Sequence, residues 1–248
     1  MKNRVIPVLL LKDSGLIKTK KFDNPKYVGD PINAIKIFNQ KEVDEMIFLD
    51  INASINNKLP NFDLIEDIAS ECFMPLAYGG GVKDLDCAEK LIKVGIEKIV
   101  INSIVLENIS FINELSQNLG SQSVVVSLDI KKSFLGSYKV YSYLKKEYSS
   151  VKLDDLLVEV QNQGAGEIFI NCVDNDGMMA GYDLALLDRV MKKVKIPVVF
   201  CGGAGSLVDL KNVSDIYDYV GLAAGSLFVF KGPHRAVLIN YPTRNIKI

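Results

Sequence analysis

The sequence predicts one domain, a (β/α)8 barrel that spans residues 1–248. The first observation behind this prediction is an internal repeat with an offset of 122 residues. It places PLAYGGG (Pro75–Gly81) on PVVFCGG (Pro197–Gly203), and Glu45 on Glu167. The second observation is an alternation of apolar strand patterns with amphipathic helical patterns. Two homologous halves with four strand–helix pairs each give the eight pairs of a closed barrel.

Short runs rich in β-branched and apolar residues, each ending in polar residues or glycine, predict the barrel strands. They are Arg4–Leu11, Met46–Leu49, Leu76–Tyr78, Lys98–Ile101, Ser123–Leu128, Glu167–Asn171, Val198–Cys201 and Tyr219–Ala223. Amphipathic helices are predicted between them at Pro31–Asn39, Asp63–Glu71, Asp84–Val94, Ile109–Leu119, Leu153–Gln163, Leu184–Val194 and Leu207–Lys211. Strands that are apolar throughout and alternate with helices are typical of a parallel sheet buried on both faces.

Two segments depart from this alternation. Residues Phe134–Tyr148 alternate at period two and predict a small β-hairpin inserted after the fifth strand. The segment GPHRAVLINYPTRNIKI contains Pro233 and Pro242, so one long uninterrupted helix is not expected at the C-terminus.

The composition narrows the function classes. Lys and Arg number 29 against 30 Asp and Glu, and the net charge of −1 gives no basic field for nucleic acid or a membrane surface. The four cysteines form no CxxC pair, so we expect neither a disulfide nor a zinc site but free thiols in a cytoplasmic protein. The apolar run Val5–Leu11 is too short to span a membrane. No cofactor is expected.

Two glycine-rich strand ends are candidates for binding phosphate. Function in such a barrel lies at the carboxyl ends of the strands, where Gly79–Gly81 follows the third strand and Gly202–Gly203 the seventh. A hydroxyl follows one strand later in each case, in Asn102–Ser103 and Gly225–Ser226. Because glycine lets the backbone approach an anion closely, the duplicated pattern favours a ligand with two phosphates. The alternative is that these glycines only form tight turns.

Charged residues also end several strands. Asp129 closes the fifth strand, and it is either a general acid or base or only a hydrogen-bond acceptor behind the site. Asp50, Asp174 and Asp176 either bind a substrate hydroxyl or cap the following helix. Lys18 lies in a lysine-rich segment that is either a solvated face or a mobile clamp on a phosphorylated ligand.

The opposite ends of four strands carry two cations and two anions, Arg4, Glu45, Lys98 and Glu167. They are expected to form a closed ring of salt bridges at the floor of the barrel, where charges usually stabilise the fold. The single histidine, His234, excludes a histidine triad and a multi-histidine metal site.

Several segments together resemble the cyclase subunit of imidazole glycerol phosphate synthase, from about Arg4 to Phe230. They are RVIPVLLLKDSGLIK, VDEMIFLDINAS, PLAYGGGV, EKIVINS, GSQSVVVSLD, GAGEIF, VDNDGMMAGYD, IPVVFCGGAGS and AAGSLF. The resemblance implies a (β/α)8 barrel that binds a glutaminase subunit at its bottom face. It also implies that ammonia passes through the barrel to a bisphosphorylated, ribulose-containing nucleotide at the top.

The glycine pattern and the resemblance together assign a set of phosphate-binding residues. They are Gly80, Gly81, Asn102, Ser103, Asp176, Gly177, Gly202, Gly203, Gly225 and Ser226. Lys18 and Asp50 are expected to contact substrate. The resemblance further implies that the ring of Arg4, Glu45, Lys98 and Glu167 is an ammonia gate, and that Glu97 is a docking residue for the glutaminase.

One departure from the family pattern bears on function. The resemblance implies two aspartates as acid and base, one ending strand five and one in strand one. Asp129 matches the first, whereas Leu10 occupies the place of the second. Near the start of each half the repeat has an offset of 119 residues, which places Lys12 on Lys131 and Leu10 on Asp129. Leucine exchanges no proton, and loss of a general acid–base group typically costs about 10²–10⁴ in rate.

We therefore expect the chain to be most similar to a cyclase-like branch encoded with surface-polysaccharide genes, in which LLLKD and GPHRAVLINYP recur. That resemblance implies a glutaminase partner, a separate sugar amidotransferase, and amidination of an N-acetyl group on a nucleotide sugar. The first alternative is a true cyclase that makes imidazole glycerol phosphate and the AICAR nucleotide. The second is a barrel that binds an unrelated phosphorylated metabolite.

Overall fold

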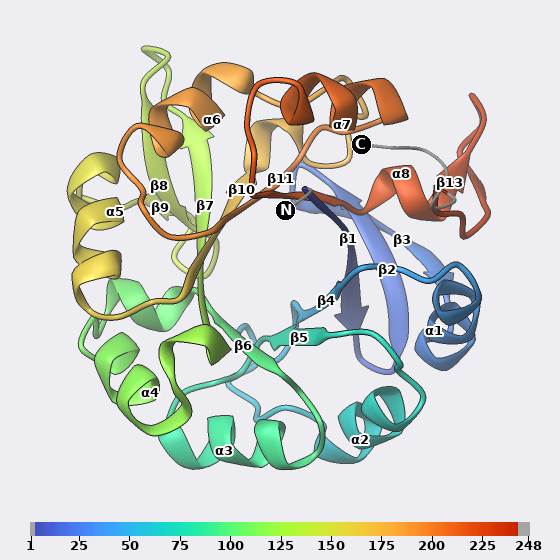
Figure 1. Cartoon of the computed structure of the whole chain (residues 1–248), viewed down its shortest axis with the longest axis horizontal. Coiled ribbons are helices and arrows are strands. Elements are labelled where there is room, and N and C mark those ends of the chain that lie inside the picture. The colour runs from blue at the N-terminus through green and yellow to red at the C-terminus, as the bar shows by residue number, and fades with distance from the viewer. Residues whose placement is uncertain (1–2, 243–248) are drawn as a thin grey trace.

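Eight parallel strands close into a barrel in the computed structural model, which describes residues 3–242 (Figure 1). In barrel order they are β1 (Arg4–Lys12), β4 (Met46–Asp50), β5 (Leu76–Gly79), β6 (Lys98–Ile101), β7 (Val124–Lys132), β10 (Glu167–Cys172), β11 (Val198–Cys201) and β12 (Val220–Ala224). Closure is made by β12 against β1, with Arg4 opposite Gly221. The predicted (β/α)8 barrel and the order of its strands are confirmed.

Helices cover the outside of the strands (Figure 1). They are α1 (Pro31–Gln40), α2 (Phe62–Ser70), α3 (Leu85–Lys93), α4 (Phe111–Leu119), α5 (Leu153–Asn162), α6 (Leu184–Met191), α7 (Leu207–Ser214) and α8 (Ser226–Val229). Short 3-10 turns lie at Ser103–Leu106, Ser121–Ser123 and Val173–Asn175. The side chains of Asp30, Asp84 and Ser206 accept hydrogen bonds from the first turns of α1, α3 and α7, which explains where these helices begin. The four-residue α8 was not expected from the sequence.

Three hairpins extend the barrel. The hairpin expected after the fifth barrel strand is formed by β8 (Tyr138–Ser142) and β9 (Glu147–Tyr148). A second one, formed by β2 (Gly15–Lys20) and β3 (Asp23–Gly29), was missed, because β3 is mostly exposed and contains a proline. A third, formed by β13 (Phe230–Lys231) and β14 (Ala236–Val237), follows α8 directly. The described part of the C-terminal segment is therefore not a long helix, as expected.

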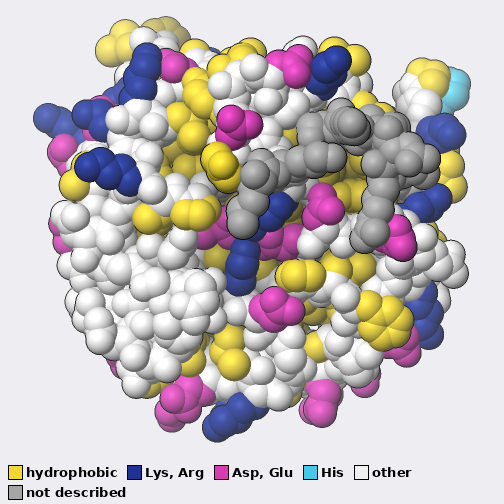
Figure 2. Space-filling view, in the orientation of Figure 1, with side chains coloured by type: hydrophobic (Ala, Val, Ile, Leu, Met, Phe, Trp, Pro, Cys, Tyr) yellow, Lys and Arg dark blue, Asp and Glu magenta, His cyan; other side chains and the backbone are white. Residues whose placement is uncertain are grey.

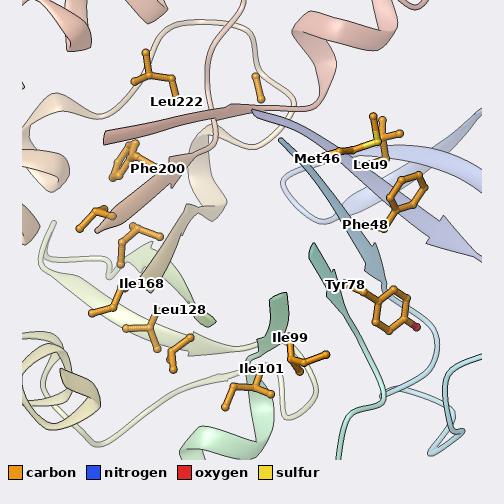
Figure 3. Packing of buried hydrophobic residues seen from close by; sticks show 14 of the residues in the cluster. Leu9, Met46, Phe48, Tyr78, Ile99, Ile101, Leu128, Ile168, Phe200 and Leu222 are labelled. Carbon is orange, nitrogen blue, oxygen red and sulfur yellow. The ribbon is translucent and has the colours of Figure 1, made fainter. Parts of the chain in front are cut away.

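The core has two layers. Side chains that point outward from the strands fill the space under the helices, and Figure 3 shows several of them, including Phe48, Ile168, Phe200 and Leu222. Side chains that point inward fill the lumen. They are Ile6, Val8, Ile47, Ala77, Val100, Val125, Phe169, Val199, Cys201 and Ala223. The lumen between the two ends of the barrel is thus lined by apolar side chains. None of the helices in residues 3–242 has both the length and the apolar character of a membrane span.

The internal repeat has a structural counterpart. The backbone N–H of Met46 donates to the carbonyl of Pro75 at 3.0 Å, and that of Ile168 donates to the carbonyl of Pro197 at 3.0 Å. The two bonds are related by the same offset of 122 residues that relates the sequence motifs.

We expect Phe200→Ala to reduce the free energy of unfolding by about 3–5 kcal/mol, because the ring is fully buried between barrel and helices. Phe134→Ala is the matched control, since that ring is fully exposed on the β7–β8 connection. Chemical denaturation of both variants measures the difference, and equal losses would contradict this account of the core.

Candidate functional site

A cavity of about 480 Å³ opens at the carboxyl ends of β1 and β4–β7. Its wall includes the glycine-rich end of β5, the end of β6 and the side chain of Asp129. A smaller cavity of about 30 Å³ adjoins it at the ends of β11 and β12. Leu10, Phe22, Leu49 and Asn171 line both cavities, so the two are parts of one mouth.

Asp129 lines the large cavity and is only 7% exposed. The side-chain amide of Asn102 donates to its Oδ2 at 2.9 Å, and that of Asn171 donates to its Oδ1 at 3.3 Å. Burial raises the pKa of the Asp129 carboxyl to about 6; the two amide hydrogen bonds oppose the shift, and the nearby Asp176 charge adds to it. A carboxyl with a pKa close to neutrality is suited to exchange protons with a bound ligand.

Leu10 occupies the part of β1 that faces the mouth. In the sheet it lies between Leu49 of β4 and Ile17 of β2, so its surroundings are apolar. Asp129 therefore has no acidic counterpart on β1, as the sequence predicted.

The glycines of both glycine-rich ends are required by close backbone contacts. A methyl group on Gly80 (φ 119°) would lie 2.2 Å from the carbonyl oxygen of Asp50. A methyl group on Gly202 (φ 102°) would lie 2.5 Å from the carbonyl oxygen of Cys172. Because no side chain fits, the strand ends leave bare backbone at two sites of the mouth that the repeat relates.

The first predicted phosphate site is the end of β5 together with the end of β6. Gly80, Gly81, Asn102 and Ser103 all line the large cavity. The backbone N–H of Gly81 donates to the Ser54 hydroxyl at 3.1 Å, and the Asn102 amide is held by Asp129. The structure thus brings these four predicted residues together beside the carboxyl group.

The second predicted phosphate site has a charged pair at its base. Lys18 Nζ lies 2.6 Å from Asp176 Oδ1, and both side chains are buried. The Thr19 hydroxyl and the Phe22 N–H donate to the other carboxylate oxygen. The lysine-rich segment was expected to be either a solvated face or a clamp on a phosphorylated ligand. The first interpretation does not hold for Lys18, because its side chain is buried and is neutralised by Asp176.

Backbone and a hydroxyl form the rest of the second site. Gly177, Gly202, Gly203, Gly225 and Ser226 line the small cavity with Lys18 and Asp176. A methyl group on Gly225 would lie 2.8 Å from Lys18 Cε, so the lysine chain packs directly on this glycine.

The other two acidic strand ends accept backbone hydrogen bonds, Asp50 within its own turn and Asp174 from the end of β7. Asp50 Oδ1 accepts from the N–H groups of Asn52 and Ala53 at 2.9 and 3.0 Å, and burial raises the pKa of this carboxyl. Asp174 Oδ2 accepts from the backbone N–H of Lys132 at 2.7 Å. Asp50 lines the large cavity, whereas Asp174 lies outside the residues that line either cavity.

Four charged side chains close the opposite, amino-terminal end of the lumen. Lys98 Nζ lies 2.7 Å from Glu45 and 2.9 Å from Glu167, and Arg4 pairs with the same two glutamates. Burial lowers the pKa of the Arg4 guanidinium, but Glu167 and Glu45 outweigh it, so the pKa lies above its ordinary value. The predicted ring is therefore complete, with two cations and two anions.

Both glutamates of the ring are buried, whereas the cations are partly exposed. Figure 2, in the orientation of Figure 1, shows acidic and basic side chains together near the centre of the view. Glu97, in the turn before β6, is exposed and lies outside the ring.

Sequence reasoning missed Asn171 and Thr19. Asn171 ends the apolar run IFIN, and a polar residue in that position is the signal that would have found it. Its Oδ1 is buried without a hydrogen-bond partner in the described structure, so the mouth retains an unused acceptor. Thr19 gave no signal, because the hairpin that positions it was not predicted. Among residues 3–242, no group of His, Cys, Asp and Glu side chains is arranged to hold a metal ion, and all four cysteines are free thiols.

Comparison with known proteins identifies the family. A model of the family described as "Histidine biosynthesis protein" matches residues 4–233. The chain belongs to this family. A "Putative imidazole glycerol phosphate synthase subunit hisF2" of Pseudomonas aeruginosa is 50% identical over 245 residues, covering 99% of this chain and 98% of that protein.

Two further relatives have similar coverage. A "Putative imidazole glycerol phosphate synthase subunit HisF" of Leptospira borgpetersenii is 49% identical, over 98% of this chain and 96% of that protein. An "Imidazole glycerol phosphate synthase subunit HisF" of Natranaerobius thermophilus is 36% identical, over 96% and 94%. The resemblance to the synthase subunit that the motifs indicated is confirmed.

The raised pKa of Asp129 makes a prediction about stability. Between about pH 4 and pH 6 the folded chain holds this proton more tightly than the unfolded chain, so the contribution of Asp129 to stability falls as pH rises. In Asp129→Asn that fall is absent. The unfolding free energy of the variant minus that of the parent should therefore increase by roughly 2–3 kcal/mol from pH 4 to pH 7.

Urea unfolding at both pH values measures this difference. Asp218→Asn, which removes an exposed carboxyl, controls for the loss of one charge. If the difference in unfolding free energy between variant and parent stays constant with pH, burial does not raise the pKa of Asp129.

Proposed function

We propose that the chain receives ammonia from a glutaminase partner and delivers it through the barrel to a phosphorylated acceptor at the carboxyl-terminal mouth. The observation that carries this proposal is a contrast. The gate ring and the apolar lumen are complete, whereas Leu10 leaves Asp129 without its acidic partner. In this proposal the ring and the lumen are the parts that conduct ammonia, and one of the two acidic groups that the family resemblance implies for cyclisation is replaced by leucine.

The charge balance of the gate supports passage of a neutral molecule. Two buried glutamates are compensated by Arg4 and Lys98, so the ring has no net charge to attract ions. Above it, the apolar lumen disfavours the ammonium ion, because burial without a partner penalises a charged form. Ammonia that enters in its neutral form is therefore kept neutral until it reaches the mouth.

The mouth supports a ligand with phosphate groups at two places. In this proposal Gly80, Gly81, Asn102 and Ser103 bind one group. Asp176, Gly177, Gly202, Gly203, Gly225 and Ser226 bind the other. Lys18 donates a hydrogen bond to the second group, and Asp176 holds Lys18 in position and neutralises it. Asp50 contacts the ligand from the wall of the large cavity, and Asp129 exchanges a proton with it.

The acceptor we propose is an N-acetyl group of a nucleotide sugar, amidinated in surface-glycan synthesis with the help of a separate sugar amidotransferase. Leu10 supports this reading, because an acceptor handled by another enzyme needs no second acid on β1.

A true cyclase is the second candidate, and the pKa of about 6 at Asp129 favours it. Cyclisation with lyase cleavage moves protons on both sides of an intermediate. Asp50 is the nearest substitute for the missing acid, but its Oδ1 is already engaged by two backbone N–H groups of its own turn.

We also propose that the domain, residues 1–248, consists of two homologous halves. The paired hydrogen bonds to Pro75 and Pro197 support this, and so do the paired contacts of Gly80 and Gly202. In this view each half of the barrel contributes one of two equivalent phosphate sites.

Complementation tests the choice between delivery and cyclisation. In a histidine auxotroph that lacks its cyclase subunit, grown with abundant ammonium to bypass the glutaminase, the parent chain should not restore growth. Leu10→Asp should restore slow growth, because it supplies the missing acid. Leu10→Asp combined with Asp129→Asn should lose that gain. Growth at normal rate with the parent chain would overturn the delivery proposal.

Two substitutions at the amino-terminal face separate docking from gating. Glu97→Lys should weaken binding of the glutaminase about tenfold or more, because it reverses an exposed charge on the proposed docking face. Lys98→Ala should leave binding intact but uncouple glutamine hydrolysis from ammonia use, since it opens the ring. Glu147→Lys, an exposed charge reversal on β9 at the other side, is the control. If Glu97→Lys binds as tightly as the parent, the docking face lies elsewhere.

A further inference from the structure

The hairpin of β13 and β14 carries an arginine into contact with Ser226, a residue that lines the small cavity of the second proposed phosphate site. Arg235 is the last turn residue before β14, with φ at 50°, and its Nη2 donates to the Ser226 hydroxyl at 3.1 Å. Its guanidinium carbon lies 4.9 Å from the centre of the Phe230 ring. The Ser226 side chain is only 3% exposed and lines the small cavity. The Ser226 hydroxyl and the Phe230 ring thus both contact the Arg235 guanidinium and fix its orientation.

The backbone of this turn is also held. Lys26 of β3 donates to the carbonyl oxygen of Arg235 at 3.0 Å, and its ammonium lies 5.1 Å from the Phe230 ring centre. Figure 1 shows β13 beyond α8, on the same side of the barrel as β3. The β2–β3 hairpin, which supplies Lys18 to the site, is therefore in contact with the hairpin that supplies Arg235.

The charges at this site do not balance without a ligand. Lys18 is neutralised by Asp176 at 2.6 Å. In the described structure no carboxylate lies within ion-pair distance of Arg235, whose partners are the Ser226 hydroxyl, the Phe230 ring and Lys26. An arginine side chain carries its charge at any physiological pH, so one positive charge at the rim is uncompensated.

Backbone donors nearby are already used. The N–H groups of Gly205 and Ser206, at the start of α7, donate to Asp209 at 2.9 and 2.8 Å. An anion at this end of the mouth therefore has to be held by side chains and by the remaining glycine backbone.

We propose that Arg235 binds the phosphate group at the second site, together with Ser226 and Lys18; this rests on the phosphate-binding mouth proposed above. A phosphate oxygen that accepts the Ser226 hydroxyl lies about 2.7 Å from Oγ, next to a guanidinium that has further N–H donors. Arginine suits this role because its planar donors match phosphate oxygens in pairs. The ligand class is a phosphate monoester. Arg235 supplies the net positive charge at this site, because the Lys18–Asp176 pair is neutral as a whole and can only donate a hydrogen bond.

Titration with inorganic phosphate, followed by amide NMR of the full chain, tests the proposal. The amides of Gly177, Gly203 and Gly225 report on the second site, and those of Gly81 and Ser103 on the first. In Arg235→Ala the second group of signals should need at least about tenfold more phosphate, because a charge-assisted hydrogen bond is lost. The first group should respond as in the parent, which also shows that the variant is folded.

Two matched variants sharpen the outcome. Arg235→Lys should recover part of the affinity, because it keeps the charge but loses the paired donors. Lys231→Ala removes a neighbouring exposed charge and should change neither group of signals.

Equal phosphate affinity of Arg235→Ala and the parent at the second site would overturn the role of Arg235 and leave the phosphate-binding mouth intact. The role of Arg235 is also overturned if Lys231→Ala weakens phosphate binding at the second site as much as Arg235→Ala does. In that case the loss of any nearby positive charge explains the effect. If phosphate moves neither group of signals in the parent, the proposed mouth itself is wrong.

Discussion

Pairing of the last barrel strand with the first is the constraint on which the rest of the structure depends. β12 runs parallel to β1, so all eight barrel strands point the same way and the sheet has no free edge within the barrel. The amino ends of all eight barrel strands therefore lie at one rim, and their carboxyl ends lie at the other. Glu45 and Glu167, far apart in sequence, share two cations at the first rim, while Asp129 and both glycine-rich ends meet at the second.

Buried carboxylates have different partners at the two rims. At the floor each glutamate is paired with two cations, so burial is offset by ion pairs in a closed ring. At the mouth Asp129 receives only two amide hydrogen bonds and no cation, and burial therefore moves its pKa to about 6. A compensated ring favours a stable, closed floor, whereas an uncompensated carboxyl favours proton exchange. The apolar lumen separates these two environments.

The second proposed phosphate site differs from the first because two hairpins are added to the barrel beside it. Its glycines repeat those of the first site, but two hairpins bring Lys18 and Arg235 to it. The lysine that lines the large cavity, Lys83, instead follows the glycine-rich turn and donates to Asn57. The first site instead borders Asp129 through Asn102. The two sites thus share a repeated backbone but differ in their charged side chains. A ligand with two unlike ends would therefore be bound in one orientation.

The sequence alone determined the barrel, because strand and helix periods and glycine turns are local signals, and the 122-residue repeat fixed their number. It also determined the ring of Arg4, Glu45, Lys98 and Glu167, which follows from strand ends, and it placed a leucine at position 10, where the family resemblance implies an aspartate. Only the tertiary structure decided that Asn171 holds Asp129, that Lys18 is buried against Asp176, and that Arg235 reaches Ser226. These contacts join segments far apart in sequence through hairpins and strand register, for which no local pattern exists.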